Sequence, residues 1–529
     1  MLRSMLSFSG GTFVSRVLGL VRENVVSATF GASMATDAFW VAFRIPNFMR
    51  RLFAEGSFSV AFVPVLTEVK EKGTPEELRL MIARIAGTLG AVLLVITALG
   101  MLFSPQVTSL FAMGALDEPD KFQLTSDLLR ITFPFLLFIS LTAMAGGVLN
   151  TFHRFAIPAV TPVIMNLCMI AAALWWAPHF QVPITSLAWA ILISGVLQLL
   201  VQLPVIARLG LLSWPRWGWR AAEVQKTLRL MVPTLFGSSV AQVNLLLDTV
   251  IATFLITGSQ TWLAQSDRLL ELPLGMFGVA LGTVILPSLS RHHVNTDRAG
   301  FSRALDWGLR VTVLISIPAM IGLVLLAEPL ISTLLQYGKY TAHDSHMASL
   351  ALAALSLGLP AFALVKVIAP AFYSRQDTKT PVRAGIASMV ANMVLNGIFL
   401  AILFVLWHQP GDLDQGWLKG LSKVPGLHMA LGMASALASY LNLWMLWRAL
   451  RRDGVYQREP GWARHWLRVG LACAAMAALL LAGLWLWQDW SVPFWTRIWR
   501  LGVLVGGGAL TYVAVLFGMG LRIKDLRAA

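Results

Sequence analysis

The sequence predicts an all-α polytopic membrane protein with about 14 transmembrane helices, arranged as two six-helix lobes plus two extra C-terminal helices. Three observations support this fold class. Only 13% of the 529 residues are charged and 57% are hydrophobic, whereas soluble domains carry about 25% charged residues. Long apolar runs follow one another along the whole chain. Basic residues gather on alternate connections between these runs.

Fourteen runs approach or exceed the length of about 20 residues that a helix needs to cross the hydrocarbon core of a bilayer. Charged residues interrupt the first, second and eighth runs, so hydropathy alone supports these three weakly. In chain order the runs are 5–30, 37–67, 80–104, 124–150, 158–178, 184–208, 224–257, 262–290, 303–327, 346–372, 381–407, 424–449, 464–488 and 496–519.

The distribution of basic residues predicts the orientation. With the N-terminus in the cytoplasm and the runs alternating in direction, 27 of the 41 Lys and Arg residues fall on inside segments and seven on outside segments. Cytoplasmic loops of membrane proteins carry such an excess. We therefore expect both termini in the cytoplasm. The net charge of +15 is then a topology signal, and the expected partners are membrane lipids rather than nucleic acid.

Weak internal matches at a nearly constant spacing indicate a duplication. The clearest one relates FSPQVTSLFAMG (103–114) to AEPLISTLLQYG (327–338). Six spans in each half would give both halves the same orientation, related by a pseudo-twofold axis along the membrane normal. Parallel repeats of this kind are typical of transporters with a substrate site between the halves. The predicted parts are 1–222, 223–450 and 451–529, the last holding the two extra helices.

Several charged residues lie together inside each of the first, second and eighth predicted spans. A central arginine costs at least about 2.5–3.5 kcal/mol on insertion scales. Because a helix rises by only about 1.5 Å per residue, the arginines in the middle of the run 37–67 are too deep to reach either surface easily. The arginines in these runs are Arg16, Arg22, Arg44, Arg50, Arg51 and Arg268, against the acidic residues Glu23, Asp37, Glu55, Asp267 and Glu271.

Because these cations outnumber the anions, pairing within the protein accounts for only part of them. A cavity that receives an anionic substrate accounts for the rest, since guanidinium groups bind phosphate through two parallel hydrogen bonds and stay charged. Lys366 is a weaker candidate because it can snorkel to the inner face. The structural alternative is a set of internal ion pairs, such as Arg22 with Asp37 or Arg268 with Glu271.

Metal and nucleotide sites are not predicted. Cys168 and Cys473 lie in apolar runs without metal-ligand spacing, and the chain contains no G-x-x-x-x-G-K-[ST] pattern. We therefore expect no cofactor, with the membrane potential or an ion gradient as the energy source. Five tryptophans within residues 485–499 predict an interfacial aromatic belt, or alternatively a groove for a lipid chain.

Four long stretches resemble the MurJ/MviN family of lipid II flippases, namely residues 13–66, QSDRLLELPLG (265–275), GVALGTVILPSLS (278–290) and VKVIAPAFYSRQDTKTPV (365–382). The family belongs to the superfamily of multidrug, oligosaccharidyl-lipid and polysaccharide exporters. The resemblance implies a groove for the undecaprenyl tail in the last two helices. It implies lipid II as the substrate, an undecaprenyl-pyrophosphate linked to MurNAc-pentapeptide-GlcNAc. It places the family's cavity arginines at Arg16, Arg22, Arg50 and Arg268 and its acidic residue at Asp37.

The resemblance further implies a transporter and not an enzyme. Its expected role is to move lipid II from the cytoplasmic to the periplasmic leaflet of the bacterial inner membrane by alternating access, in peptidoglycan synthesis, cell wall biogenesis and cell shape. We expect a monomer. On the residues alone, a cation-coupled multidrug antiporter stays open, although acidic residues should then dominate the cavity. A membrane-embedded enzyme stays open too, although it needs paired carboxylates near a membrane face.

Overall fold

The computed structural model describes residues 2–51, 57–275, 285, 287–292, 295, 297–409 and 416–522, with the backbone alone for 2–14, 57, 59–60 and 232–241. Every regular element in these ranges is helical. Within them, nine helices or short helix series are long and apolar enough to cross a membrane. A bent pair, α15 and α16, makes a tenth if counted as one span. The all-α polytopic fold is confirmed, and the count of 14 spans stays a prediction.

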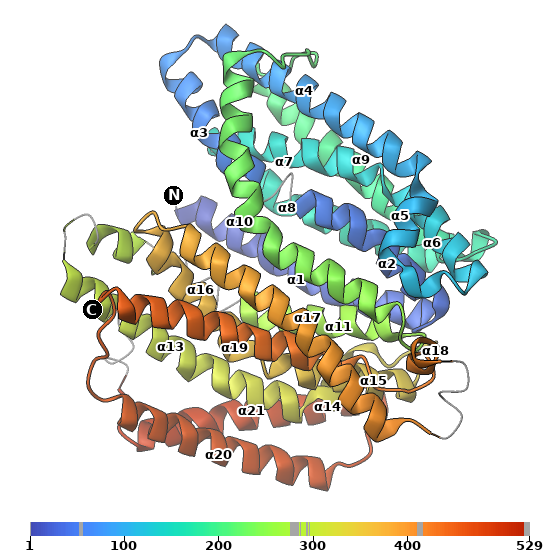
Figure 1. Cartoon of the computed structure of the whole chain (residues 1–529), viewed down its shortest axis with the longest axis vertical. Helices are drawn as coiled ribbons and strands as arrows, with labels where there is room; N and C mark the ends of the chain where they lie inside the picture. The colour runs from blue at the N-terminus through green and yellow to red at the C-terminus, as the bar shows by residue number, and fades with distance from the viewer. Residues whose placement is uncertain are drawn as a thin grey trace. The chain divides into compact units, whose positions relative to one another are not determined.

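The first compact unit comprises Met1–Thr261 together with Tyr337–Tyr340. Most of its α-helices overlap the predicted apolar runs, and Figure 1 shows their arrangement. They are α1 (Leu2–Phe30), α2 (Met34–Arg50), α3 (Ser57–Lys72), α4 (Pro75–Leu102), α5 (Ser104–Phe111), α6 (Pro119–Thr132), α7 (Phe135–Thr151), α8 (Ala156–Ala171), α9 (Thr185–Arg208) and α10 (Ala222–Ala252).

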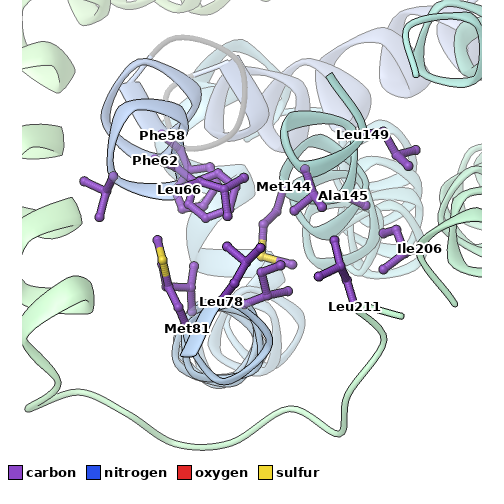
Figure 2. Packing of buried hydrophobic residues seen from close by; sticks show 14 of the residues in the cluster. Phe58, Phe62, Leu66, Leu78, Met81, Met144, Ala145, Leu149, Ile206 and Leu211 are labelled. Atoms are coloured by element: carbon purple, nitrogen blue, oxygen red, sulfur yellow. The ribbon is translucent and has the colours of Figure 1, made fainter. Parts of the chain in front are cut away.

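An apolar core joins α3, α4, α7 and α9 in this unit, as Figure 2 shows. Phe62 of α3 and Leu149 of α7 are fully buried in it. Leu211, which follows α9, is buried in the same core. Since lipid is as apolar as these side chains, such helices are held together mainly by close packing. The core fixes the positions of these four helices relative to one another.

The second unit comprises Trp262–Gln336 and Thr341–Ala529. In it α17 packs against α19, and α20 packs against α21. Its described helices are α11 (Ser259–Pro273, which begins in the first unit), α13 (Arg298–Leu325), α14 (Ala327–Leu335), α15 (Ala342–Ser356), α16 (Leu359–Tyr373), α17 (Lys379–Trp407), α18 (Trp417–Leu421), α19 (Met429–Arg452), α20 (Trp462–Leu486) and α21 (Phe494–Gly518).

The helix boundaries repeat with the spacing that the sequence matches predict. Helix α4 runs from 75 to 102 and α13 from 298 to 325, so the two have the same length and one constant offset at both ends. The short α5 and α14 begin at 104 and 327, which is the same offset. The starts of α7 and α16, at 135 and 359, differ from it by a single position. These coincidences support the duplication, while the lobe boundaries at 222 and 450 stay predictions.

Two predicted spans contain a break between helices. The run 124–150 is divided between α6 and α7, and the run 346–372 is divided between α15 and α16, which are bent by 41°. Pro134 and Pro360 lie at these two breaks. Proline has no backbone N–H group to continue a helix, so both breaks have a local cause.

The predicted run 37–67 is described in two parts, α2 ending at Arg50 and α3 beginning at Ser57. Its continuity between these helices lies outside the described residues. Glu55, predicted as a supporting cavity charge, lies outside them as well.

Candidate functional site

Helix α1 carries the most deeply buried of the predicted cations. Arg22 and Glu23 are only 2% and 4% exposed, and their side chains form an ion pair with each other. The sequence suggests Asp37 as a partner of Arg22, but the carboxylate paired with Arg22 is that of its own neighbour. Arg16, nearly two turns earlier on the same helix, is half-buried.

A neutral side chain on α8 also holds Arg22. The Nη1 group of Arg22 donates to Oδ1 of Asn166 over 3.0 Å, while the Asn166 amide donates to the Ser15 carbonyl oxygen over 3.1 Å. Asn166 is 4% exposed, so the whole chain of contacts lies in the packed contact between α1 and α8. These contacts therefore fix the direction of the Arg22 guanidinium group.

The three arginines of the α2 region interact with neutral oxygens. Arg44 donates to the Thr249 hydroxyl over 2.7 Å, and Arg51 donates to the Gln242 amide oxygen over 3.3 Å. Arg50 donates twice to Oδ1 of Asn47, from Nε over 3.0 Å and from Nη2 over 2.8 Å. All three arginines are half-buried. Each of these hydrogen bonds directs a guanidinium N–H group toward a neutral oxygen.

Thr249 and Gln242 lie on α10, whereas the arginines belong to α2 and its C-terminal end. The contacts therefore connect segments of the first unit that are far apart in sequence. Sequence reasoning missed Asn166, Thr249 and Gln242, because a neutral polar residue in an apolar run gives no signal of which helix it faces.

Asp37 is 2% exposed and binds backbone as well as side-chain donors. Its Oδ2 accepts from the Gly258 amide over 2.7 Å. Its Oδ1 accepts from the Thr261 amide over 3.0 Å and from the Thr261 hydroxyl over 2.8 Å. Asp37 also lies in the first turn of α2, where the helix dipole favours a negative charge. The carboxylate thus fastens the start of α2 to the turn that precedes α11 and to the first residues of that helix.

The predicted charges of the second unit lie on α11. Trp262 and Ser266, one turn apart, face α15: the Trp262 Nε1 group donates to Asp344 over 3.2 Å, and the Ser266 hydroxyl donates to the Ala348 carbonyl over 2.8 Å. These two residues are almost completely buried. The predicted charges Asp267 and Arg268 are half-buried and Glu271 is exposed, so the charged side of α11 is its less covered side.

One ion pair in the first unit involves residues that are not among the predicted cavity charges. Lys226, in the second turn of α10, donates to Glu68 near the end of α3 over 2.5 Å. This bond lowers the pKa of the Glu68 carboxyl below its ordinary value. Both groups are well exposed, so the pair contributes little to stability. It does bring the C-terminal turn of α3 to the start of α10.

The structure thus brings Arg22 and Glu23 together and holds Arg44 and Arg51 against α10. It does not pair Arg22 with Asp37. Among the described residues, no group of three or more His, Cys, Asp or Glu side chains could hold a metal ion. Hydrogen bonds give defined directions to the guanidinium groups of Arg22, Arg44, Arg50 and Arg51.

A family model described as lipid II flippase MurJ matches residues 26–499. A Vibrio cholerae protein named a probable lipid II flippase MurJ is 44% identical, covering 100% of this chain and 98% of the relative. A Burkholderia cenocepacia protein named lipid II flippase MurJ is 39% identical, covering 98% of this chain and 96% of the relative. The similarity therefore extends over essentially the full length of both proteins.

Solved structures agree with the sequence relatives. One described as lipid II flippase MurJ in an inward closed conformation is similar with a TM-score of 0.77 at 26% identity, covering 96% of this chain and 97% of that one. An inward-facing multidrug transporter of the MATE family has a TM-score of 0.64 at 12% identity, covering 83% of this chain and 95% of that one. The second likeness is one of fold alone. The chain belongs to the lipid II flippase MurJ family.

Proposed function

We propose that this protein is a lipid II flippase, which moves the undecaprenyl-pyrophosphate-linked peptidoglycan precursor from the cytoplasmic to the periplasmic leaflet. The observation that carries the proposal is full-length similarity to proteins named lipid II flippases, at 44% identity in one case. The multidrug antiporter alternative is not favoured, because its named representative shares only the fold, at 12% identity. The protein acts as a transporter and makes or breaks no covalent bond.

The pyrophosphate is bound by Arg16, Arg22, Arg50 and Arg268. Phosphate oxygens accept paired hydrogen bonds from guanidinium forks, and each bond to a charged group is worth about 1.5–3 kcal/mol. Arg22 is directed by Asn166 and Glu23, so it meets the substrate with little loss of side-chain entropy. The remaining charges shape the field around these four, namely Glu23, Asp37, Arg44, Arg51, Glu55, Asp267 and Glu271.

Transport follows alternating access of two lobes, 1–222 and 223–450, with 451–529 holding the lipid tail. Apolar α20 and α21, both with exposed large hydrophobic side chains, suit a polyprenyl chain. The protein works as a monomer in the bacterial inner membrane with both ends in the cytoplasm, which the distribution of its basic residues supports. The energy comes from the membrane potential or an ion gradient, since one charge moved through 100 mV yields about 2.3 kcal/mol.

Translocation of lipid II in proteoliposomes tests the site. Single variants Arg16→Ala, Arg50→Ala and Arg268→Ala should each lower the translocation rate by about 10- to 100-fold, because each removes charge-assisted hydrogen bonds to the pyrophosphate. Arg79→Ala is the matched control, since Arg79 is exposed in the second turn of α4, and its rate should equal that of the unsubstituted protein. Undiminished translocation in the three cavity variants would refute the assignment.

A further inference from the structure

The connection between α9 and α10 carries an unusual exposed surface. Residues 211–221 read LLSWPRWGWRA and form no regular helix or strand. Trp214, Trp217 and Trp219 are 89%, 64% and 43% exposed, and the rings of the last two stack with centroids 6.1 Å apart. Large aromatic side chains this exposed mark an interaction surface when they gather in one segment.

The backbone of this connection is fastened to α4. The Arg216 amide donates to the Ala83 carbonyl oxygen over 2.9 Å, and the Gly218 amide donates to the Thr88 hydroxyl over 3.1 Å. The approach is so close that a Cβ atom at Gly87 would lie 2.3 Å from the Arg216 carbonyl oxygen. The segment begins at Leu211, which is buried in the core of Figure 2.

Because both its start and its middle are anchored, the connection presents its tryptophans from a fixed backbone. No large ordering cost then accompanies the binding of a partner.

The place of contact on α4 is the border between polar and apolar sequence. All the charged residues of α4 precede Ile85, and the following stretch 85–102 contains none. Ala83, Gly87 and Thr88 straddle that border. In a membrane-spanning helix this border lies at the interface between the head groups and the hydrocarbon, which is where tryptophan is enriched.

The positive charge of this segment favours an anionic lipid over a neutral one. From Arg208 to Arg220 the chain carries three arginines and no acidic residue, and all three arginines are exposed. Glu223, the next acidic residue, is already paired with Arg84 over 2.9 Å. Arg216 and Arg220 flank the stacked tryptophans in sequence, so guanidinium groups and aromatic rings alternate along the segment.

We propose that residues 211–221 form a preformed binding surface for an anionic phospholipid, with Arg216 and Arg220 on its phosphate and the tryptophans among its glycerol and upper acyl groups. The occupant is a bilayer lipid such as phosphatidylglycerol. The surface is separate from the residues assigned to lipid II, and in the proposed orientation it faces the cytoplasmic leaflet.

Lipid binding to the purified full-length protein tests the charged part. Phosphatidylglycerol and phosphatidylcholine are titrated in detergent, and the bound lipids are resolved by native mass spectrometry. The double variant Arg216→Gln/Arg220→Gln should weaken the tightest phosphatidylglycerol site by about five-fold for each arginine. Phosphatidylcholine binding should be unchanged. The control Arg451→Gln/Arg452→Gln removes the same charge from exposed positions on α19 and should keep the tightest site.

Equal phosphatidylglycerol affinity in the loop variant and the control would overturn the proposal. Competition by millimolar glycerol phosphate that is as effective as added lipid would also overturn it, because the site would then bind soluble phosphate.

Bilayer insertion of the tryptophans needs a separate measurement. The experiment uses proteoliposomes with two kinds of brominated lipid. Lipids brominated near the head group quench the fluorescence of tryptophans at the interface, and lipids brominated deep in the acyl chains quench that of tryptophans near the bilayer centre. The triple variant Trp214→Phe, Trp217→Phe and Trp219→Phe should lose a component that shallow bromines quench more strongly than deep ones. If the lost component is quenched by neither lipid, the rings lie in water and the proposal fails.

Discussion

Arg22, one of the four arginines proposed to bind the pyrophosphate, is buried and held by neighbouring side chains. Its guanidinium group contacts the Glu23 carboxylate and donates to the Asn166 amide oxygen. Asn166 is itself held by the Ser15 carbonyl, so the guanidinium group has a defined direction before any substrate arrives. This kind of support by a residue behind the binding group is what turns a charged side chain into a precise binding site.

The support can be tested at Asn166. Asn166→Leu should lower the free energy of unfolding by about 1.5–3 kcal/mol, because a buried charged donor loses its acceptor. Thermal unfolding of the detergent-solubilised protein measures the effect. Cys168→Ala, on the same helix, removes a half-buried thiol with no role in this network and should have a smaller effect. An unfolding temperature for Asn166→Leu equal to that of the unsubstituted protein would show that the bond is unimportant.

Single residues are predictable from the sequence only where their chemistry conflicts with their surroundings. Arginines in an apolar run stand out, so Arg22, Arg44 and Arg51 can be selected as candidates without a structure. Their partners cannot, because threonine, asparagine and glutamine are tolerated in many helices of membrane proteins. Asp37 is selected for its charge, whereas its three contacts to 258–261 depend on a turn that the sequence does not position.

At the scale of elements, a close backbone contact joins the end of α1 to a segment far along the chain. The Lys339 amide donates to the Ala28 carbonyl oxygen over 2.8 Å. Gly31 and Gly338 have φ angles of +65° and +58°, and a Cβ atom at Gly338 would lie 2.3 Å from the Ala28 oxygen. The contact explains why 337–340 belongs to the first unit although its neighbours in sequence belong to the second.

Gly338→Ala should therefore destabilise the protein by more than the roughly 1–2 kcal/mol that a left-handed backbone alone costs an alanine. Gly210→Ala is the matched control, because Gly210 has φ +71° with nothing within 4 Å of the added Cβ atom. Its effect should be limited to the backbone cost. Thermal unfolding of the two variants side by side gives the comparison. Equal losses of stability would mean that the contact between 28–31 and 337–340 rearranges at little cost in free energy.

The start of α13 should give a pH-dependent contribution to stability. Asp297 caps this helix by accepting from the Gly300 amide over 2.8 Å. That bond, followed by the hydrogen bond and charge of His292, lowers the pKa of the Asp297 carboxyl. A lowered pKa in the folded state means that the contribution is present at neutral pH and is lost as the pH falls through that lowered value.

The unfolding temperatures of Asp297→Ala and the unsubstituted protein should thus differ at neutral pH and approach each other as the pH falls below about 4. Ser33→Ala removes a cap that does not titrate, on α2, and should give a pH-independent difference. A difference for Asp297→Ala that keeps its full size well below the ordinary pKa of an aspartate would contradict the assignment.

Elements are predictable from the sequence to the extent that they are uniformly apolar. The predicted run 184–208 coincides with α9 to within one residue, and 303–327 largely overlaps α13, because few polar residues compete with the helical pattern there. The run 346–372 is predicted as one span although it contains α15 and α16, bent by 41°. A break inside an apolar run has no hydropathy signature, and Gly358 and Pro360 mark it in the sequence.

At the scale of the whole molecule, the repeated helix boundaries and the family membership describe a duplicated transporter. The constant spacing between α4 and α13 and between α5 and α14 can be predicted from the sequence, because similar short motifs occur at helix ends in both halves. Lobe movement and energy coupling cannot be predicted from the sequence, because both depend on differences in free energy between conformational states of the same chain.

The most direct test of the account is depletion of this protein in its own bacterium, followed by leaflet-resolved detection of lipid II. The account predicts that lipid II accumulates and is inaccessible to reagents added outside the inner membrane. Re-expression of the natural protein should restore access, while Arg50→Ala should not. If lipid II still reaches the periplasmic leaflet at its normal rate after depletion, the central claim is contradicted.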